Sequence, residues 1–143
     1  MSKIFIDADG CPVVDITIKL ALQAQKECII ICDTSHVFEK SGATTITVDK
    51  GNDSVDFTLV NLIKKGDIVI TQDYGLAAMC LAREALPINQ NGKTYTSENI
   101  DALLMQRHTA KKIRQAGGRL KGETKRTPQQ NHDFEEGLKR LIG

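Results

Sequence analysis

The sequence lacks long hydrophobic runs and low-complexity blocks. No apolar stretch approaches the roughly 20 residues that a membrane-spanning helix needs, so we expect no membrane partner. Residues 1–3 lead straight into a short apolar stretch, and we therefore expect no secretory leader and a cytoplasmic protein. The 143 residues, 41% of them hydrophobic, are enough for a single domain with a sizeable core.

Aromatic residues are scarce, and the cysteines are poorly spaced for cross-links. With four Phe and two Tyr, the chain offers few side chains that could stack on bases, so we expect little base preference in any nucleic acid that it binds. Cys28 and Cys32 lie about 13 Å apart on a predicted strand, which excludes a disulfide or a shared zinc between them. We expect reduced, mostly buried thiols. For Cys11 alone, which lies beside the acidic residues described below, a reactive thiol is an alternative to a packed one.

The net charge of +1 hides a strong asymmetry. Residues 1–106 carry nine Lys/Arg against fourteen Asp/Glu, whereas residues 107–126 carry eight against one. Such a basic segment is typical of a protein that acts on a polyanion, although a solvated surface explains it equally well. The candidates for binding a nucleic-acid backbone are Arg107, Lys111, Lys112, Arg114, Arg119, Lys121, Lys125 and Arg126.

Short apolar runs typical of buried strands alternate with longer runs of helical spacing. The first predicted strand begins at Ile4. The other four cover Cys28–Cys32, Thr44–Val48, Asp67–Thr71 and Pro87–Asn89. The predicted helices cover Pro12–Gln25, a stretch from near Asp53 to Gly66, Tyr74–Ala85 and Thr96–Arg114. This alternation predicts an α/β fold, a three-layer α/β/α sandwich with a mainly parallel sheet and right-handed crossovers.

The end of the chain carries the start signal of a helix. Residues 119–126 have no periodicity, and we expect them to be mobile. Thr127 as N-cap, Pro128 at the first helical position and Gln130 three residues after the cap match a capping box. We expect residues 127–142 to form a helix that docks on the domain through an apolar face. That face consists of Phe134, Leu138, Leu141 and Ile142.

Aspartates follow two of the predicted strands and begin one predicted helix. Asp7 and Asp9 follow the first strand, and Asp73 follows the fourth. Asp53 and Asp56 lie three residues apart in the first turn of the middle helix. Because ligands bind outside the carboxyl ends of parallel strands, we expect these side chains to gather at one edge of the sheet. Helix capping explains each acid singly, but carboxylates gathered at one edge are what Mg²⁺ or Mn²⁺ needs.

Several motifs resemble those of one bacterial family. The pieces IFIDADGCPV, GNDSVD, GDIVITQDYGLA and YTSENI, with the basic and then helical tail, resemble the YaiI/YqxD family over nearly the whole chain. That family is related to PIN-like domains, which have a Rossmann-like fold and are typically Mg²⁺- or Mn²⁺-dependent ribonucleases. The resemblance therefore implies a single PIN-like domain over residues 1–143.

The resemblance also implies roles for individual residues. Thr71 stands where PIN-like domains often place a hydroxyl two residues before the last aspartate, and Asp9 belongs to the family's own opening motif. Many PIN-like nucleases use a glutamate on the middle helix, whereas this chain has shorter aspartates there, which leaves the number of metal ions open. The implied catalytic residues are Asp7, Asp56, Asp73 and Thr71, and the implied metal ligands are Asp7, Asp9, Asp53, Asp56 and Asp73.

The expected function is a divalent-metal-dependent nuclease that acts on single-stranded RNA, with the basic segment holding the RNA backbone. Two alternatives stay open. A haloacid-dehalogenase-like phosphatase would use Asp7 as the nucleophile and Asp9 as the acid/base, with Thr34 or Ser35 and Lys64 or Lys65 binding phosphate. A non-catalytic RNA- or nucleotide-binding module would keep the acids but turn nothing over. The sequence also leaves the oligomeric state open, with a homodimer among the alternatives.

Overall fold

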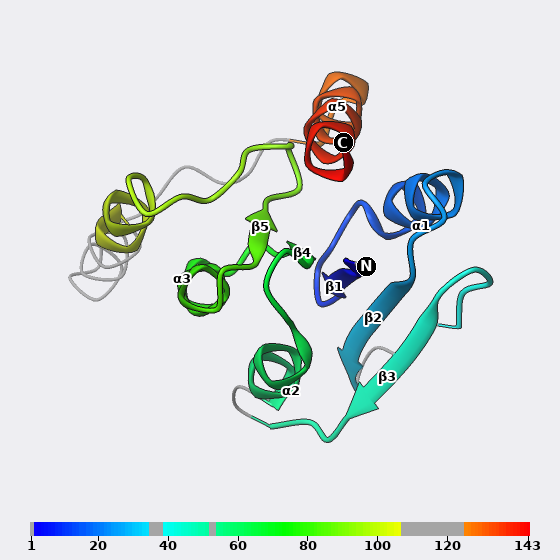
Figure 1. The fold of residues 1–143 in the computed structure, drawn as a ribbon, viewed down its shortest axis with the longest axis horizontal. Helices are drawn as coiled ribbons and strands as arrows, with labels where there is room; N and C mark the ends of the chain where they lie inside the picture. Colours follow the sequence, from blue (N-terminus) through cyan, green and yellow to red (C-terminus); the bar gives the residue numbers. More distant parts are fainter. Residues whose placement is uncertain (1, 35–38, 52–53, 107–124) are drawn as a thin grey trace.

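The structure, a computed structural model, describes residues 2–34, 39–51, 54–106 and 125–143. Its centre is a five-stranded sheet in which neighbouring strands pair in parallel, in the order β3-β2-β1-β4-β5 (Figure 1). The strands are β1 (Ile4–Asp7), β2 (Cys28–Asp33), β3 (Thr44–Val48), β4 (Ile68–Ile70) and β5 (Leu86–Ile88). The predicted parallel sheet is therefore confirmed, and the observed strand ends differ from the predicted ones by at most one residue.

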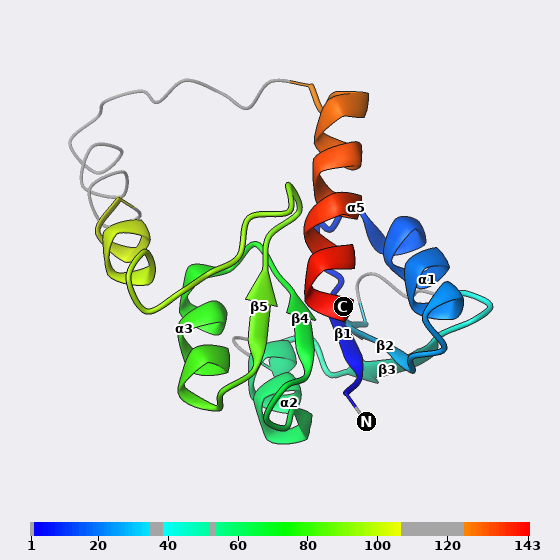
Figure 2. The ribbon, with the colours of Figure 1, turned by 45° about the horizontal axis from the view of Figure 1, so that its top comes forward.

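Helices cover both faces of this sheet (Figure 2). On one face α1 (Val14–Gln23) and α5 (Pro128–Ile142) share a cluster of buried residues with the strands. On the other face α2 (Ser54–Leu62) and α3 (Tyr74–Ala82) share a second cluster. The fold is thus the α/β/α sandwich that the sequence predicts. In the part of the chain that the structure describes, no helix is both long and apolar enough to cross a membrane.

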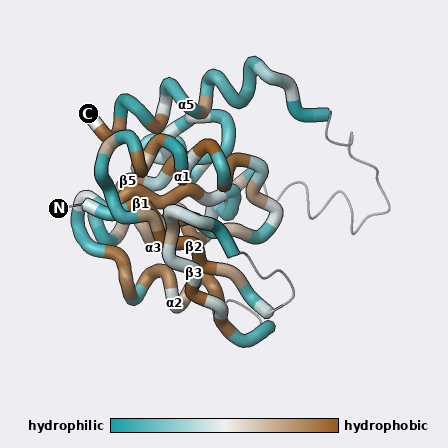
Figure 3. The backbone as a smooth tube through the Cα atoms, turned by 90° about the vertical axis from the view of Figure 1, so that its right-hand side faces the viewer, coloured by the Kyte–Doolittle hydropathy of each residue, from teal (hydrophilic) through white to brown (hydrophobic). Residues whose placement is uncertain are grey.

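The side chains of successive β1 residues lie on alternate faces of the sheet. Ile4 and Ile6 join the cluster beneath α1 and α5, whereas Phe5 joins the cluster beneath α2 and α3. Each of the three side chains is at most 1% exposed, and burying one such side chain stabilises the fold by roughly 1.5–3 kcal/mol. Figure 3 shows the hydrophobic residues concentrated around the strands. Because β1 is also paired on both sides, the position of its last residue, Asp7, is firmly fixed.

The register of the sheet brings the ends of neighbouring strands level. Ile6 of β1 lies opposite Ile30 of β2 and Ile70 of β4. Asp7, which follows Ile6, and Thr71, which follows Ile70, therefore stand at the same end of the sheet, which we call the carboxyl edge. The opposite end, where the strands begin, is the amino edge.

Three helices end earlier than the sequence predicts, and the middle one, α2, ends at Leu62 rather than at Gly66. α1 ends at Gln23 rather than at Gln25, and α3 ends at Ala82 rather than at Ala85. Each of these two is followed by a Schellman turn whose left-handed residue, Gln25 (φ 57°) or Glu84 (φ 60°), is not a glycine. The usual stop signal is therefore missing from the sequence. α1 also begins two residues later than predicted, at Val14. Of the predicted Thr96–Arg114 helix, residues 100–106 are helical, and residues 107–114 lie outside the described residues.

α5 begins with the predicted capping box. The Thr127 hydroxyl accepts a hydrogen bond from the Gln130 N–H (3.3 Å), and the Gln130 side chain accepts one from the Thr127 N–H (2.8 Å). The apolar face packs as expected, with Phe134 and Leu138 fully buried. Gly137 lies directly against the turn after β5, since a Cβ there would stand 2.8 Å from the Gly92 Cα. The backbone of α5 therefore contacts that turn.

Candidate functional site

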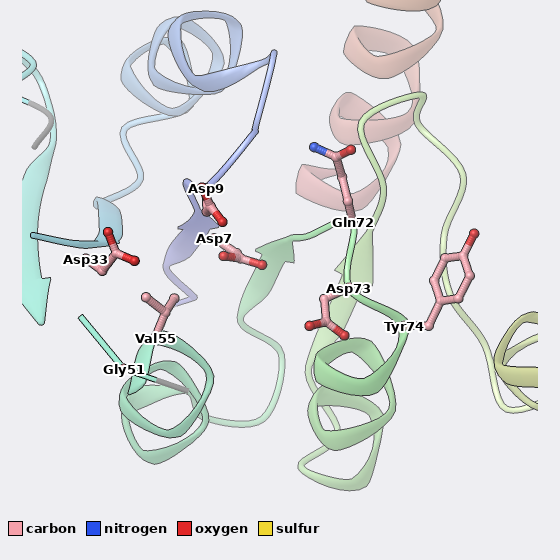
Figure 4. A pocket seen from close by; sticks show the side chains of 8 residues that line it. All are labelled: Asp7, Asp9, Asp33, Gly51, Val55, Gln72, Asp73 and Tyr74. Carbon is pink, nitrogen blue, oxygen red and sulfur yellow. The ribbon is translucent and has the colours of Figure 1, made fainter. Parts of the chain in front are cut away.

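An open cleft of about 420 Å³ lies at the carboxyl edge of the sheet. It is bounded by the ends of β1, β2 and β4 and by the segment that leads into α2 (Figure 4). Four of its lining residues are aspartates. The lining residues are Asp7, Asp9, Asp33, Gly51, Val55, Gln72, Asp73 and Tyr74. Three of the five predicted acids, Asp7, Asp9 and Asp73, line the cleft, and we refer to this place as the acidic cleft.

Asp7 is held by a hydroxyl rather than by a helix terminus. The Thr71 hydroxyl donates a hydrogen bond of 2.8 Å to the Asp7 carboxyl. Helix α1 has Val13 as its N-cap, and the Asp7 carboxyl is bound by Thr71 instead of by the start of this helix. The interpretation of Asp7 as a cap of the helix that follows it is thus wrong.

The surroundings of Asp7 oppose its negative charge. The pKa of Asp7 is raised from 3.8 to about 6: burial raises it most, the hydrogen bond from Thr71 lowers it, and the charges of Asp56, Asp73 and Asp9 raise it. Each of these three aspartates is therefore near enough to repel the Asp7 carboxylate. Perturbed carboxyl groups that share a cleft are a common feature of functional sites.

Asp73 both caps a helix and faces the cleft. Its carboxyl accepts hydrogen bonds from the Gly75 N–H (2.8 Å) and the Leu76 N–H (3.2 Å) at the start of α3. Figure 4 shows the Asp7 and Asp73 carboxyl groups turned toward the same space. The Asp73 N–H donates to the Thr71 hydroxyl (3.0 Å), which in turn donates to Asp7. Thr71, placed in the site by the resemblance alone, is therefore the link between the two aspartates.

The remaining predicted acids take different places. Asp56 lies in the first turn of α2 and acts on Asp7 through its charge. Asp9 is exposed at the rim of the cleft. Asp53 lies outside the described residues. Asp33, which ends β2, lines the cleft although it had no predicted role; its place after an apolar strand was the available signal.

Gln72 and Tyr74 also line the cleft, and the sequence pattern carried no sign of this. The Gln72 side-chain amide donates to the Gly10 carbonyl (2.8 Å), so it ties the loop after β4 to the loop after β1. The ring of Tyr74 points away from the carboxyl groups (Figure 4) and lies edge-on to Tyr95, with 6.0 Å between the ring centroids.

The acidic cleft offers suitable donors for a divalent cation. Carboxylate oxygens are the ligands that Mg²⁺ and Mn²⁺ prefer, and the mutual repulsion around Asp7 is what a bound cation would relieve. Among the described residues, however, no three His, Cys, Asp or Glu side chains are grouped closely enough to hold one ion. Coordination of one ion by Asp7, Asp56 and Asp73 therefore stays a prediction.

The cysteines are free, and Cys11, beside the acidic cleft, does not have the character of a reactive thiolate. Cys28, Cys32 and Cys80 are buried, and Cys11 is half-buried, so the predicted reduced thiols are confirmed. Burial and, to a lesser degree, the charge of Asp7 raise the pKa of Cys11 to about 11. A thiol with this pKa is protonated at neutral pH, which favours packing over reactivity.

Most of the predicted nucleic-acid-binding residues cannot be placed. Arg107, Lys111, Lys112, Arg114, Arg119 and Lys121 lie outside the described residues, and Lys125 is exposed. Arg126 donates to the side chains of Asn131 (2.7 Å) and Asn91 (2.8 Å) and to the Gln90 carbonyl (2.6 Å). The expectation of a mobile segment up to residue 126 is therefore wrong for Arg126, which joins the start of α5 to the turn after β5.

Comparison with known proteins identifies the family. A family model described as "Uncharacterized BCR, YaiI/YqxD family" matches residues 5–143. The UPF0178 protein of Exiguobacterium sibiricum is 56% identical over 140 residues, which cover 98% of this chain and 96% of that protein. UPF0178 proteins of Clostridium acetobutylicum and Enterococcus faecalis are 44% and 43% identical over 98% of this chain and 96% and 97% of their own lengths. No solved structure matches. The chain therefore belongs to the YaiI/YqxD family of UPF0178 proteins, as its motifs indicate.

Proposed function

We propose that the protein is a cytoplasmic, divalent-metal-dependent nuclease that cleaves RNA in the acidic cleft. One observation carries this proposal: the Asp7 carboxyl caps no α1 amide and is placed where three other aspartates raise its pKa. Repulsion of this kind lowers the stability of the folded chain, and a bound cation would offset it. The carboxylates of the cleft thus lower the stability of the folded chain, and their oxygens are suitable ligands for a cation.

The chain's own residues provide a rigid support for such a site. Mg²⁺ or Mn²⁺ would be held by the predicted ligands Asp7, Asp9, Asp53, Asp56 and Asp73. The bound metal would lower the pKa of a water molecule and neutralise charge on the leaving oxygen of a phosphodiester. The Thr71 hydroxyl orients Asp7, and the α3 amides orient Asp73. The bond from Gln72 to Gly10 fixes the two loops that flank these carboxyls.

RNA is the proposed substrate because the chain has, besides the acidic cleft, a basic segment that could bind a polyanion. An acidic cleft without bound cations repels a polyanion, so backbone affinity has to come from elsewhere in the chain. Residues 107–126 carry eight Lys/Arg against one acid, which is enough to neutralise several phosphates. Contacts to phosphates give affinity without sequence choice, in keeping with the scarcity of aromatic residues.

The charge of Asp56 favours the nuclease over the phosphatase alternative. A phosphatase that used Asp7 as nucleophile and Asp9 as acid/base would have no role for Asp56. Asp56 nevertheless lies close enough to raise the pKa of Asp7. A third carboxylate near the attacking oxygen would repel a phosphate group, whereas it would strengthen binding of a cation.

The test is an RNA cleavage assay with Mn²⁺, comparing the wild type with Asp7→Asn and Asp101→Asn. The second substitution removes the same charge from an exposed position outside the cleft. We expect wild-type cleavage that EDTA abolishes, a loss of at least about 100-fold in Asp7→Asn, and normal cleavage in Asp101→Asn. Binding of RNA without turnover would identify a non-catalytic module. Turnover of a small phosphate ester, with a beryllium fluoride adduct on Asp7, would identify a phosphatase; either result contradicts the proposal.

A further inference from the structure

Tyr95 lies outside the acidic cleft but contacts its framework. It follows the turn after β5 and is only 5% exposed. Its hydroxyl donates a hydrogen bond of 3.1 Å to the Thr71 carbonyl, 24 residues earlier in the chain. Its backbone N–H donates to the Pro87 carbonyl of β5 (3.0 Å), which holds the phenol from the other end. Tyr95 is therefore anchored on the sheet and reaches the end of β4.

Thr71, the residue to which Tyr95 is bound, connects two aspartates of the acidic cleft. It is 1% exposed, and its hydroxyl donates to Asp7 and accepts from the Asp73 N–H. Its own N–H donates to the Ile88 carbonyl of β5 (3.1 Å). The β-branched Thr71 side chain is stiff about χ1, so its hydroxyl moves whenever its backbone moves. A donor that fixes the Thr71 carbonyl therefore also fixes the contacts of the Thr71 hydroxyl.

We propose that Tyr95 is a positioning residue for the acidic cleft. Tyr95 acts through Thr71 to fix the position of the Asp7 carboxyl and of the start of α3. As a role in catalysis, this inference rests on the proposed nuclease function. A displacement of about 1 Å in a catalytic group can cost about 100-fold in rate, so a bond that prevents such displacement has a functional effect without touching the substrate.

Two features keep this bond in place. Burial, with the neighbouring Tyr74 and Asp73, raises the pKa of Tyr95 above its ordinary value, so the phenol retains its proton and remains a donor. The turn that precedes Tyr95 is held against α5 by the close contact of Gly92 with Gly137. Arg126, which precedes α5, binds the same turn through Asn91, so α5 and the residues just before it support the turn that leads to Tyr95.

The test compares Tyr95→Phe with Thr17→Val in the full chain, by amide hydrogen exchange and Mn²⁺ affinity. Thr17 is the matched control, because its fully buried hydroxyl also donates to a backbone carbonyl, that of Val13 (2.7 Å), within α1. In Tyr95→Phe, protection of the Asp73 amide should fall about tenfold more than protection of the β2 amides. Mn²⁺ affinity should fall about tenfold. Thr17→Val should lower protection equally at both places and leave Mn²⁺ affinity unchanged.

A uniform loss of protection in Tyr95→Phe, with Mn²⁺ affinity as in Thr17→Val, would show that Tyr95 is only a core residue. Thr71→Val provides a second variant. If Tyr95 acts through Thr71, then Tyr95→Phe should cause no further loss of protection at Asp73 in that background, and additive losses would overturn the inference. A wild type that binds no Mn²⁺ contradicts the proposed function, whereas exchange at the Asp73 amide still decides the role of Tyr95.

Discussion

Asp67 and Asp7 are the same residue type at opposite ends of neighbouring strands, and their surroundings differ sharply. Asp67 precedes β4 at the amino edge and is only 4% exposed. Its two carboxyl oxygens accept hydrogen bonds from the Lys3 N–H (2.9 Å) and the Lys64 N–H (2.8 Å). Asp7 ends β1 at the carboxyl edge, accepts from the Thr71 hydroxyl and is repelled by three other aspartates.

The comparison shows that burial alone does not distinguish a structural acid from a functional one. At the amino edge a single carboxylate satisfies two backbone donors, and its presence is explained by the fold. At the carboxyl edge, burial and the charges of three other aspartates raise the pKa of Asp7, so the folded chain opposes its negative charge. Under the proposed function, the aspartates at this edge would bind a divalent cation, which would offset the repulsion between them.

The largest effect is expected at the amino edge. Asp67→Ala removes the acceptor of two backbone N–H groups and leaves them without their partner, which should lower the free energy of unfolding by about 3–4 kcal/mol. Urea unfolding measures this change. Asp101→Ala, at an exposed position, should change the free energy of unfolding by less than about 0.5 kcal/mol. Equal effects of the two substitutions would mean that Asp67 is not a structural acid.

The opposite sign is expected for Asp7→Asn. The amide oxygen of asparagine can still accept the hydrogen bond from Thr71, while the repelled charge is removed. Because the pKa of Asp7 is raised from 3.8 to about 6, the substitution should increase the free energy of unfolding by about 2–3 kcal/mol at pH 8 without metal. Urea unfolding at pH 8 in EDTA measures this change. A destabilised variant would place Asp7 with Asp67 as a structural acid.

The stability difference between Asp7→Asn and the wild type should depend on pH. Below about pH 4 the Asp7 carboxyl is protonated in both the folded and the unfolded wild type, so the difference should be at its smallest. Between pH 4 and 6 the unfolded chain loses this proton and the folded chain keeps it, so wild-type stability falls relative to the variant. Above about pH 6 the difference should reach its full value. Unfolding of both proteins at several pH values measures this, and a difference that does not change with pH would refute the assigned cause.

The smallest effect is expected for Glu84→Gly, again at the amino edge. Glu84 has a left-handed backbone (φ 60°) in the turn that ends α3, a conformation that glycine adopts without strain. Its ion pair with Lys65 (3.9 Å) is largely exposed and contributes little. The substitution should raise the free energy of unfolding by about 0.5–1 kcal/mol in thermal or urea unfolding. A loss of stability would mean that the contacts of Glu84 outweigh its backbone strain.

The fold and the acidic edge followed from local sequence patterns. Apolar strands such as the run that begins at Ile4, and the Thr127 capping box, depend on neighbouring residues and were predicted correctly. The early end of α3 was missed because Glu84 takes a conformation that usually signals itself by a glycine. The contacts of Tyr95 with Thr71 and of Arg126 with Asn91 depend on strand order and helix packing, and no local pattern announces them.

Mn²⁺ binding measured by titration calorimetry at pH 7.5 tests the central claim, that the acidic cleft binds a divalent cation. Three proteins are needed: the wild type, Asp7→Asn and the matched surface variant Asp101→Asn. We predict that the wild type and Asp101→Asn bind Mn²⁺ with equal affinity and that Asp7→Asn binds at least about tenfold more weakly although its fold is more stable. No binding by the wild type, or equal binding by Asp7→Asn, would contradict the account.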